Sequence, residues 1–183
     1  MRIITGKLKG RKIPIPKTDL LRPTSDRAKE GLFSVIAARV YLDNCRILDL
    51  FAGSGSLGFE AISRGAASCL FVDREIRHTR HIEKLARSFD IESQVQTLTA
   101  EVETFLAQEH GRFDFIFADP PYDYFLMEEM VEKIVNKQWL FDDGWFILEH
   151  DKNFDFEPHE KCVFSKAYGR TIVSIFKLNS EGF

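Results

Sequence analysis

Cysteine is scarce in this sequence of 183 residues. The three cysteines, Cys45, Cys69 and Cys162, stand far apart, and none belongs to a C-x-x-C pair or to a cluster with histidine. The scarcity argues against a disulfide framework, and the spacing argues against a zinc site. We therefore expect three reduced, structural thiols and no bound metal.

Long apolar runs are also missing. No stretch approaches the roughly 18 residues that a membrane-spanning helix needs, and the N-terminus lacks the apolar core and cleavage site of a secretory signal. The hydrophobic fraction of 44% and the charged fraction of 29% are ordinary for a globular protein. We therefore expect a cytoplasmic protein without membrane contact, in which residues 1–183 form one domain.

Acidic residues are few in the first thirty positions, although the whole chain carries a net charge of −3. That segment holds nine Lys or Arg and only three acids, whereas the remainder holds 16 basic and 25 acidic residues. A basic arm on an acidic body favours a local contact with a polyanion. A solvated, flexible terminus is the alternative. The residues that we expect to contact RNA are Lys7, Lys9, Arg11, Lys12, Arg22, Thr24 and Arg27.

A second basic surface is predicted on a helix. Arg77, Arg80, Lys84 and Arg87 repeat at spacings of three, four and three, opposite the apolar stripe of the same helix. A solvated face is the ordinary interpretation of this pattern, and phosphate contact is the alternative.

Strand and helix patterns alternate along most of the chain, which predicts an α/β protein with a parallel sheet and helices on both faces. Only a turn-like Tyr-Gly-Arg separates the last two strand patterns, so these should pair as an antiparallel hairpin. Glycine and proline punctuate residues 1–25, which we interpret as a basic arm or hairpin before a catalytic core over 26–183. Helices are expected near 26–40, 58–64, 102–109 and 126–137, and strands at 46–51, 68–72, 94–98, 113–118, 145–149, 162–165 and 171–177. One further helix is expected between the strands at 68–72 and 94–98, with an apolar stripe of Ile82, Leu85, Ala86 and Phe89.

A glycine turn follows the first of these strands, in the stretch L-D-L-F-A-G-S-G-S-L-G. Gly53, Gly55 and Gly58 spell G-x-G-x-x-G, and Asp73 follows twenty residues later, where a ribose-binding carboxylate belongs. The motif alone does not choose the cofactor. Asp49, just before the turn, would repel a pyrophosphate but attract the amino group and sulfonium of S-adenosylmethionine.

The second chemical motif is Asp119-Pro120-Pro121-Tyr122, which follows the apolar run F-D-F-I-F-A. Two consecutive prolines cannot continue a strand ladder and hold a rigid loop. The amine on a nucleobase is a poor nucleophile because its lone pair is delocalised into the ring. A carboxylate and a backbone carbonyl that accept its two N–H bonds would orient that lone pair toward a methyl group, and the tyrosine could stack on the base.

D-L-F-A-G-S-G together with D-P-P-Y resembles the amino-methylating Class I S-adenosylmethionine-dependent methyltransferases. More narrowly, the chain is similar to the bacterial small-subunit (16S) ribosomal RNA guanine-N2 methyltransferase family. The stretches that carry this resemblance are M-R-I-I-T-G-K-L-K-G-R-K, R-P-T-S-D-R-A-K-E-G-L-F, the glycine turn, D-P-P-Y and Y-G-R-T. The resemblance implies a Rossmann-like, seven-stranded, mostly parallel sheet with the last hairpin at its edge. We expect the protein to be a monomer. It also implies that the substrate is guanine N2 of 16S rRNA, within the small ribosomal subunit or an assembly intermediate.

The resemblance also assigns roles to individual residues. Asp73 would bind the ribose of the cofactor and Glu101 its adenine, although relatives often carry the shorter Asp at the latter position. Asp119 through Tyr122 would hold the target amine, and Asp119 would also border the cofactor. Tyr124 and Phe125 have no assigned counterpart and are either a stacking surface or core. The residues expected at the methionine end of the cofactor are Asp49, Gly53 and Gly55, and Phe51 is expected to bind the cofactor as well.

Three other functions remain open at this point. An adenine-N6 methyltransferase acting on DNA or RNA would share D-P-P-Y, but the chain has no extra domain for reading a duplex. A nicotinamide-dependent reductase would leave Asp49 and D-P-P-Y unexplained. A non-catalytic RNA-binding or assembly factor could keep the fold without the chemistry.

Overall fold

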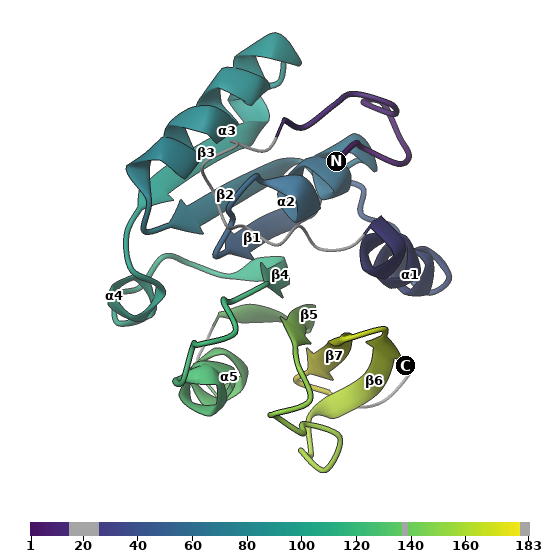
Figure 1. Cartoon of the computed structure of the whole chain (residues 1–183), viewed down its shortest axis with the longest axis vertical. Helices are drawn as coiled ribbons and strands as arrows, with labels where there is room; N and C mark the ends of the chain where they lie inside the picture. The colour runs from purple at the N-terminus through teal and green to yellow at the C-terminus, as the bar shows by residue number, and fades with distance from the viewer. Residues whose placement is uncertain (15–25, 137–138, 180–183) are drawn as a thin grey trace.

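The computed structural model describes residues 1–14, 26–136 and 139–179. Seven strands form one sheet in the order β3-β2-β1-β4-β5-β7-β6 (Figure 1). All neighbouring pairs from β3 to β5 are parallel, and β7 pairs antiparallel with both β5 and β6. The strands are β1 Arg46–Leu50, β2 Ser68–Asp73, β3 Val95–Thr99, β4 Phe113–Ala118, β5 Leu140–His150, β6 Cys162–Tyr168 and β7 Thr171–Lys177.

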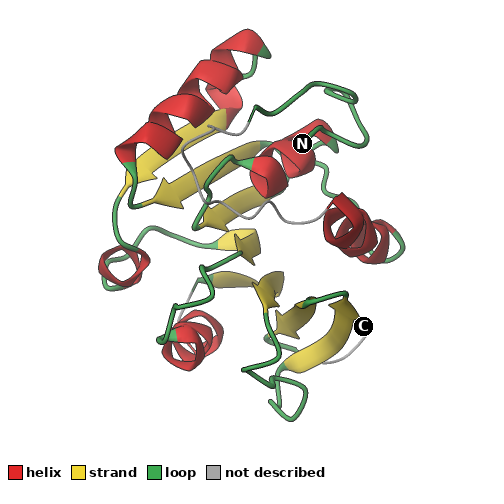
Figure 2. Cartoon of the chain, in the orientation of Figure 1, coloured by secondary structure: helices red, strands yellow, loops and turns green. Residues whose placement is uncertain are grey.

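Helices cover both faces of this sheet (Figure 2). One core cluster joins α1, α2 and α3 to one face, and a second joins α4 and α5 to the other. From Phe115 to Ala118 the buried side chains of β4 alternate between the two clusters, with Phe115 and Phe117 on the first side and Ile116 and Ala118 on the second. This explains why the strand is apolar at every position except Asp114. The helices are α1 Asp26–Ala37, α2 Ser56–Ser63, α3 Ile76–Ser88, α4 Val102–Leu106, α5 Met127–Asn136 and the 3-10 turn η1 Glu92–Gln94.

The predicted fold class and C-terminal hairpin are confirmed, while several element boundaries were wrong. The first helix ends at Ala37 rather than near residue 40, because Arg39 and Val40 both donate to the Ile36 carbonyl and close the last turn. β5 begins at Leu140 rather than 145, since Leu140 pairs with Phe113 beyond a bulge. β6 extends through exposed polar residues, and those are invisible to a search for apolar runs.

The N-terminal segment is an ordered loop rather than a free tail. An isolated antiparallel bridge joins Arg2 to Lys12, and Ile3, Leu8 and Ile13 are buried against the first core cluster. Among the described residues, no helix combines the length and apolar character that crossing a bilayer requires.

Candidate active site

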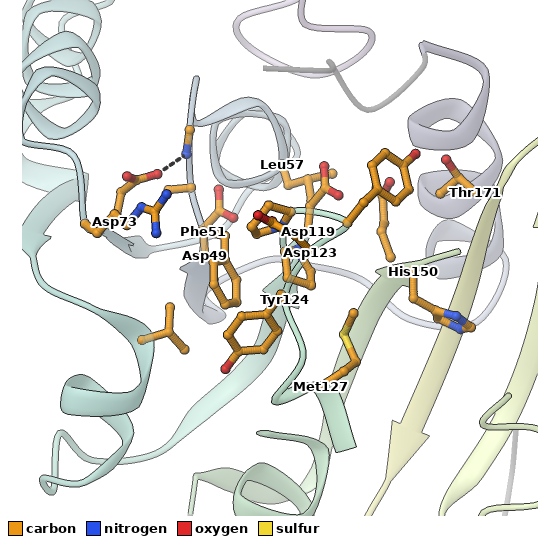
Figure 3. Close-up of a pocket in the computed structure, with 18 of the residues that line it drawn as sticks. Asp49, Phe51, Leu57, Asp73, Asp119, Asp123, Tyr124, Met127, His150 and Thr171 are labelled. Atoms are coloured by element: carbon orange, nitrogen blue, oxygen red, sulfur yellow. Dashed lines mark hydrogen bonds between the residues drawn. The ribbon is translucent and has the colours of Figure 1, made fainter. Parts of the chain in front are cut away.

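A cavity of about 940 Å³ lies at the carboxyl ends of the central strands (Figure 3). Ligands of open α/β sheets bind at this edge because loops from neighbouring parallel strands meet there. Both predicted motifs border this one cavity. The predicted site residues that line it are Asp49, Phe51, Gly53, Asp73, Glu101, Asp119, Pro120, Pro121 and Tyr122.

Asp73 organises the glycine turn. Its Oδ2 accepts a hydrogen bond from the Gly53 N–H at 2.7 Å, drawn as the dashed line in Figure 3. Its Oδ1 accepts the Glu75 N–H at 2.8 Å and lies 3.0 Å from His78 Nδ1. The carboxylate therefore holds the loops after β1 and β2 together at the edge of the cavity.

The glycines of the turn have different structural roles. Gly53 and Gly55 have φ of 52° and 76°, values that strain residues with a side chain. Gly53 lines the cavity, whereas Gly55 is not among its lining residues and donates to the Ala52 carbonyl at 2.7 Å. Gly58 lies in α2, where a Cβ would come within 2.3 Å of the Phe71 ring. Gly55 and Gly58 therefore set the shape of the turn without lining the cavity.

Phe51 connects the two motifs physically. It adopts φ of 55°, which is uncommon for a bulky residue, and such strain concentrates at functional sites. Its ring packs edge-on against Tyr124, with the centroids 4.9 Å apart. Tyr124 is half-buried and lines the cavity, and its N–H donates to the Pro121 carbonyl at 2.9 Å. Tyr124 thus braces the D-P-P-Y loop against the glycine turn.

Asp49 is a buried carboxyl group in an acidic site. It is 2% exposed, and Oδ2 accepts the Gly58 N–H at 3.0 Å. Burial raises its pKa well above the ordinary value, and the charges of Asp119 and Asp73 raise it further. A cation bound in this cavity would relieve that repulsion.

Two other aromatic residues at the D-P-P-Y loop, Tyr122 and Phe125, are more exposed than Tyr124. Tyr122 is 49% and Phe125 is 82% exposed, and both line the cavity. Glu101 is exposed at the N-cap of α4 and borders the cavity as well. The loop therefore presents aromatic surface to a planar ligand.

The sequence interpretation missed one wall of the cavity. Residues 149–151 at the end of β5 and residues 168–171 of the β6–β7 turn also line it. His150 and Thr171 lie at the opposite end from Asp73 (Figure 3). The signal was present, since Glu149-His150-Asp151 follows an apolar strand in the same way as the other acids do.

Both ring nitrogens of His150 have hydrogen-bond partners in this wall. Its Nδ1 lies 2.8 Å from the Asp151 carbonyl, which only accepts, so Nδ1 carries the proton. Its Nε2 lies 2.8 Å from Ser174 Oγ and accepts from that hydroxyl in the neutral ring. Burial lowers the pKa of His150, which favours the neutral form.

The basic residues predicted to contact RNA lie beside this site rather than in it. Lys7, Lys9, Arg11 and Lys12 are exposed and do not line the cavity. The Lys7 N–H donates to the Ser63 carbonyl at the far end of α2, about 10 Å along the helix from Ser56, which does line the cavity. Three further predicted contacts, Arg22, Thr24 and the side chain of Arg27, fall outside the described residues.

The sheet order, the glycine turn after β1 and the helices on both faces define a Rossmann-like methyltransferase fold. A solved Escherichia coli structure described as a methyltransferase has a TM-score of 0.84 and 29% identity, covering 98% of this chain and 99% of that chain. A Thermus thermophilus 16S rRNA N2 G1207 methyltransferase in complex with AdoMet and guanosine has a TM-score of 0.67 and 22% identity, over 87% of this chain and 45% of that chain. At that identity the likeness shows the fold alone.

Sequence comparison places the chain more narrowly. The family model "Conserved hypothetical protein 95" matches residues 1–177. "Ribosomal RNA small subunit methyltransferase D" of Haemophilus influenzae is 35% identical, covering 95% of this chain and 91% of that protein. Its namesake in Escherichia coli K12 is 34% identical, covering 82% and 75%. This chain belongs to that family of ribosomal RNA methyltransferases.

Proposed function

We propose that this protein transfers a methyl group from S-adenosylmethionine to the exocyclic N2 amine of a guanine in 16S rRNA. Its substrate is the small ribosomal subunit or an intermediate of subunit assembly, in the cytoplasm. The observation that carries this proposal is the meeting of the glycine turn and the D-P-P-Y loop at one cavity. Names of the family relatives support the choice of ribosomal RNA.

The acidic half of the cavity fits this methyl donor better than a dinucleotide. S-adenosylmethionine carries a sulfonium and an amino group but no phosphate, and bound there it supplies an electrophilic methyl group. Burial raises the pKa of Asp49, and the charges of the neighbouring acids raise it further. A cationic ligand would lower this pKa, whereas a pyrophosphate would add to the repulsion.

On the acceptor side, Asp119 and the Pro120 carbonyl would accept the two N–H bonds of the target amine. This arrangement turns the nitrogen lone pair toward the donor and stabilises the positive charge that develops on nitrogen. After transfer the amine loses one proton, to Asp119 or to water. Tyr122 borders the same space and would stack on the base.

The choice of guanine N2 rests on the resemblance to the 16S rRNA guanine-N2 methyltransferase family. D-P-P-Y alone suits any planar exocyclic amine, so the base must be identified by experiment.

The deciding experiment compares 16S rRNA from cells with and without this gene by nuclease mapping and mass spectrometry. We expect one N2-methylguanine to disappear in the deletion strain and to return when purified protein and S-adenosylmethionine are added to mutant subunits. Unchanged guanines, or loss of a methyladenine instead, would contradict the proposal.

A further inference from the structure

Four carboxylates stand at the ends of four neighbouring strands. Across the sheet they are Asp73 on β2, Asp49 on β1, Asp119 directly after β4, and Glu149 on β5. All four line the same cavity. The proposed function uses the first three and leaves Glu149 without a role.

Strand register places Glu149 beside Asp119. Ala118 pairs with Leu148 in the parallel β4–β5 ladder, so the next residue of each strand reaches the cavity at the same level. Adjacent strands are about 4.8 Å apart, so carboxylates on neighbouring strands can both reach one bound nucleobase.

Side-chain alternation places Glu149 on the same side of the sheet as the donor acids. Ile147 packs in the core cluster with α1, α2 and α3, and Glu149 follows two residues later. Asp49 and Asp73 each follow a member of that same cluster, Ile47 and Phe71, at the same interval. Glu149 therefore faces the cavity from the strand next to Asp119, on the side away from Asp49.

Glu149 is also withdrawn from bulk water, at 2% exposed, although it lines the cavity. The adjacent His150 has its own partners in the Asp151 carbonyl and Ser174. A buried carboxylate is stabilised by N–H donors, and it strongly disfavours a lone pair placed against it.

Guanine offers such a donor next to the reactive amine, because N1–H and the N2 amine are adjacent on its Watson–Crick edge. Adenine presents a lone pair at N1. We propose that Glu149 accepts the guanine N1–H and thereby selects guanine as the methyl acceptor. This inference rests on the proposed function, since it requires guanine N2 to be the target.

The test uses an analogue that keeps the N2 amine but lacks the N1 proton. The substrates are small subunits reconstituted with 16S rRNA that is assembled by splinted ligation. In one of the two RNAs the mapped guanosine is replaced by 2,6-diaminopurine riboside, whose N1 is an acceptor. The measured quantity is the ratio of kcat/KM for guanine RNA to kcat/KM for diaminopurine RNA. We expect the unmodified protein to favour guanine by about 100-fold or more.

Glu149→Gln tests the residue itself, because its amide can donate to the diaminopurine N1. We expect the ratio to fall to about tenfold or less, through slower transfer to guanine and faster transfer to the analogue. Asp123→Asn is the matched control, since it removes one charge from an exposed side chain that lines the same cavity. Both enzymes meet the same two RNAs, so effects of the analogue on RNA folding cancel between them.

Binding of S-adenosylhomocysteine, followed by calorimetry, shows that each variant is folded. A purely structural role for Glu149 would slow both substrates equally, and an unchanged ratio in Glu149→Gln would overturn the inference. An equal fall of the ratio in Asp123→Asn would overturn it too. If the unmodified enzyme methylates guanine N2 but does not discriminate between guanine RNA and diaminopurine RNA, only this inference fails. If it does not methylate guanine N2 at all, the proposed function fails as well.

Discussion

The Asp49 carboxylate accepts the Gly58 N–H at 3.0 Å, which joins the end of β1 to the first turn of α2. Gly58 is the third residue of that helix, so its N–H has no partner within the helix. A carboxylate at this position also faces the positive end of the helix dipole. One side chain thus holds the glycine turn closed and contributes negative charge to the cavity.

The Asp49→Asn variant keeps the shape of this contact and removes its charge. We expect the affinity for S-adenosylmethionine to fall about 10- to 100-fold, because a hydrogen bond to a charged group becomes a neutral one. The affinity for S-adenosylhomocysteine, which lacks the sulfonium, should fall less. Calorimetric titration of both ligands checks this, and equal losses would contradict a contact with the sulfonium.

Although Asp49→Asn should weaken cofactor binding, it should make the ligand-free protein more stable at neutral pH. The pKa of Asp49 is raised in the folded state above its ordinary value of 3.8. The stabilisation due to its neutral form is complete below that ordinary value and is lost as pH rises through the folded pKa. At pH 7 to 8, Asp49→Asn should therefore raise the melting temperature, and the gain should vanish in acid. A gain that is constant from pH 4 to 8 would contradict burial of the charge as its cause.

Asp119→Ala separates chemistry from cofactor binding. We expect kcat for methyl transfer to fall by about 1000-fold, in the range of losses seen when a preorganised electrostatic partner of a transition state is removed. Affinity for S-adenosylhomocysteine should stay within about threefold, since the glycine turn and Asp49 are untouched. Single-turnover assays on subunits from the deletion strain measure the first quantity. If this variant transfers the methyl group at the normal rate, the D-P-P-Y loop does not take part in the reaction as proposed.

The sequence was sufficient to predict the sheet, the glycine turn and the D-P-P-Y loop, because each has a local pattern. Phe113–Ala118, for example, is apolar at every position except Asp114, and its predicted bounds agree with the structure. β6 was underestimated because its second half carries polar, exposed residues whose strand conformation is set by pairing with β7. Long-range pairing of this kind leaves no local trace.

The cavity wall beyond Asp119 was missed for a related reason. Glu149 reaches the site only because β5 lies next to β4, and that neighbourhood is a property of strand order. The bracing of Phe51 by Tyr124 is likewise a contact between distant loops. The sequence showed that aromatic residues follow D-P-P-Y, but not what they pack against.

Two helical glycines allow a matched test of packing behind the site. A Cβ at Gly58 would lie 2.3 Å from the Phe71 ring, which is fully buried. A Cβ at Gly31 would lie 2.2 Å from the end of the Tyr168 ring, which is only partly buried and can swing aside. We expect Gly58→Ala to cost about 1–3 kcal/mol. Gly31→Ala should be closer to neutral, because alanine favours a helix by about 1 kcal/mol. Urea denaturation of both variants compares them, and equal costs would contradict this assignment.

The proposed RNA contacts are testable through their salt dependence. The double variant Lys9→Glu with Lys12→Glu should weaken binding to 16S rRNA and reduce the slope of log K against log salt by about 0.7–0.9 for each lost phosphate contact. Cofactor affinity should not change, because both side chains lie outside the cavity. The matched variant Arg80→Glu with Lys84→Glu reports on the exposed face of α3. A loss of RNA binding confined to the Arg80→Glu/Lys84→Glu variant would mean that α3, rather than the N-terminal arm, contacts the RNA.

The arm is held in place by a buried ion pair. Lys29 Nζ lies 3.8 Å from Glu60 Oε2, and both side chains have 0% exposure. Lys29 also donates to the Arg2 carbonyl at 2.8 Å and to Ser56 Oγ at 3.0 Å. Glu60 accepts the N–H groups of Ile4 and Thr5 at 2.8 and 3.1 Å. The pair therefore connects the arm, α1 and α2 next to the cavity.

Lys29→Met should leave the Glu60 charge buried with less compensation and lower the free energy of unfolding by about 3 kcal/mol. Arg64→Met is the matched control, because Arg64 contacts the same carboxylate at 2.9 Å from a position 17% exposed and should cost less. Hydrogen exchange should show faster opening of residues 1–13 in Lys29→Met than in the control. Lys29 also holds Ser56, and Ser56 lines the cavity. We therefore expect Lys29→Met to lower the affinity for the cofactor as well. Stability within about 0.5 kcal/mol of the unmodified protein would mean that apolar contacts of Ile3, Leu8 and Ile13 hold the arm without the ion pair.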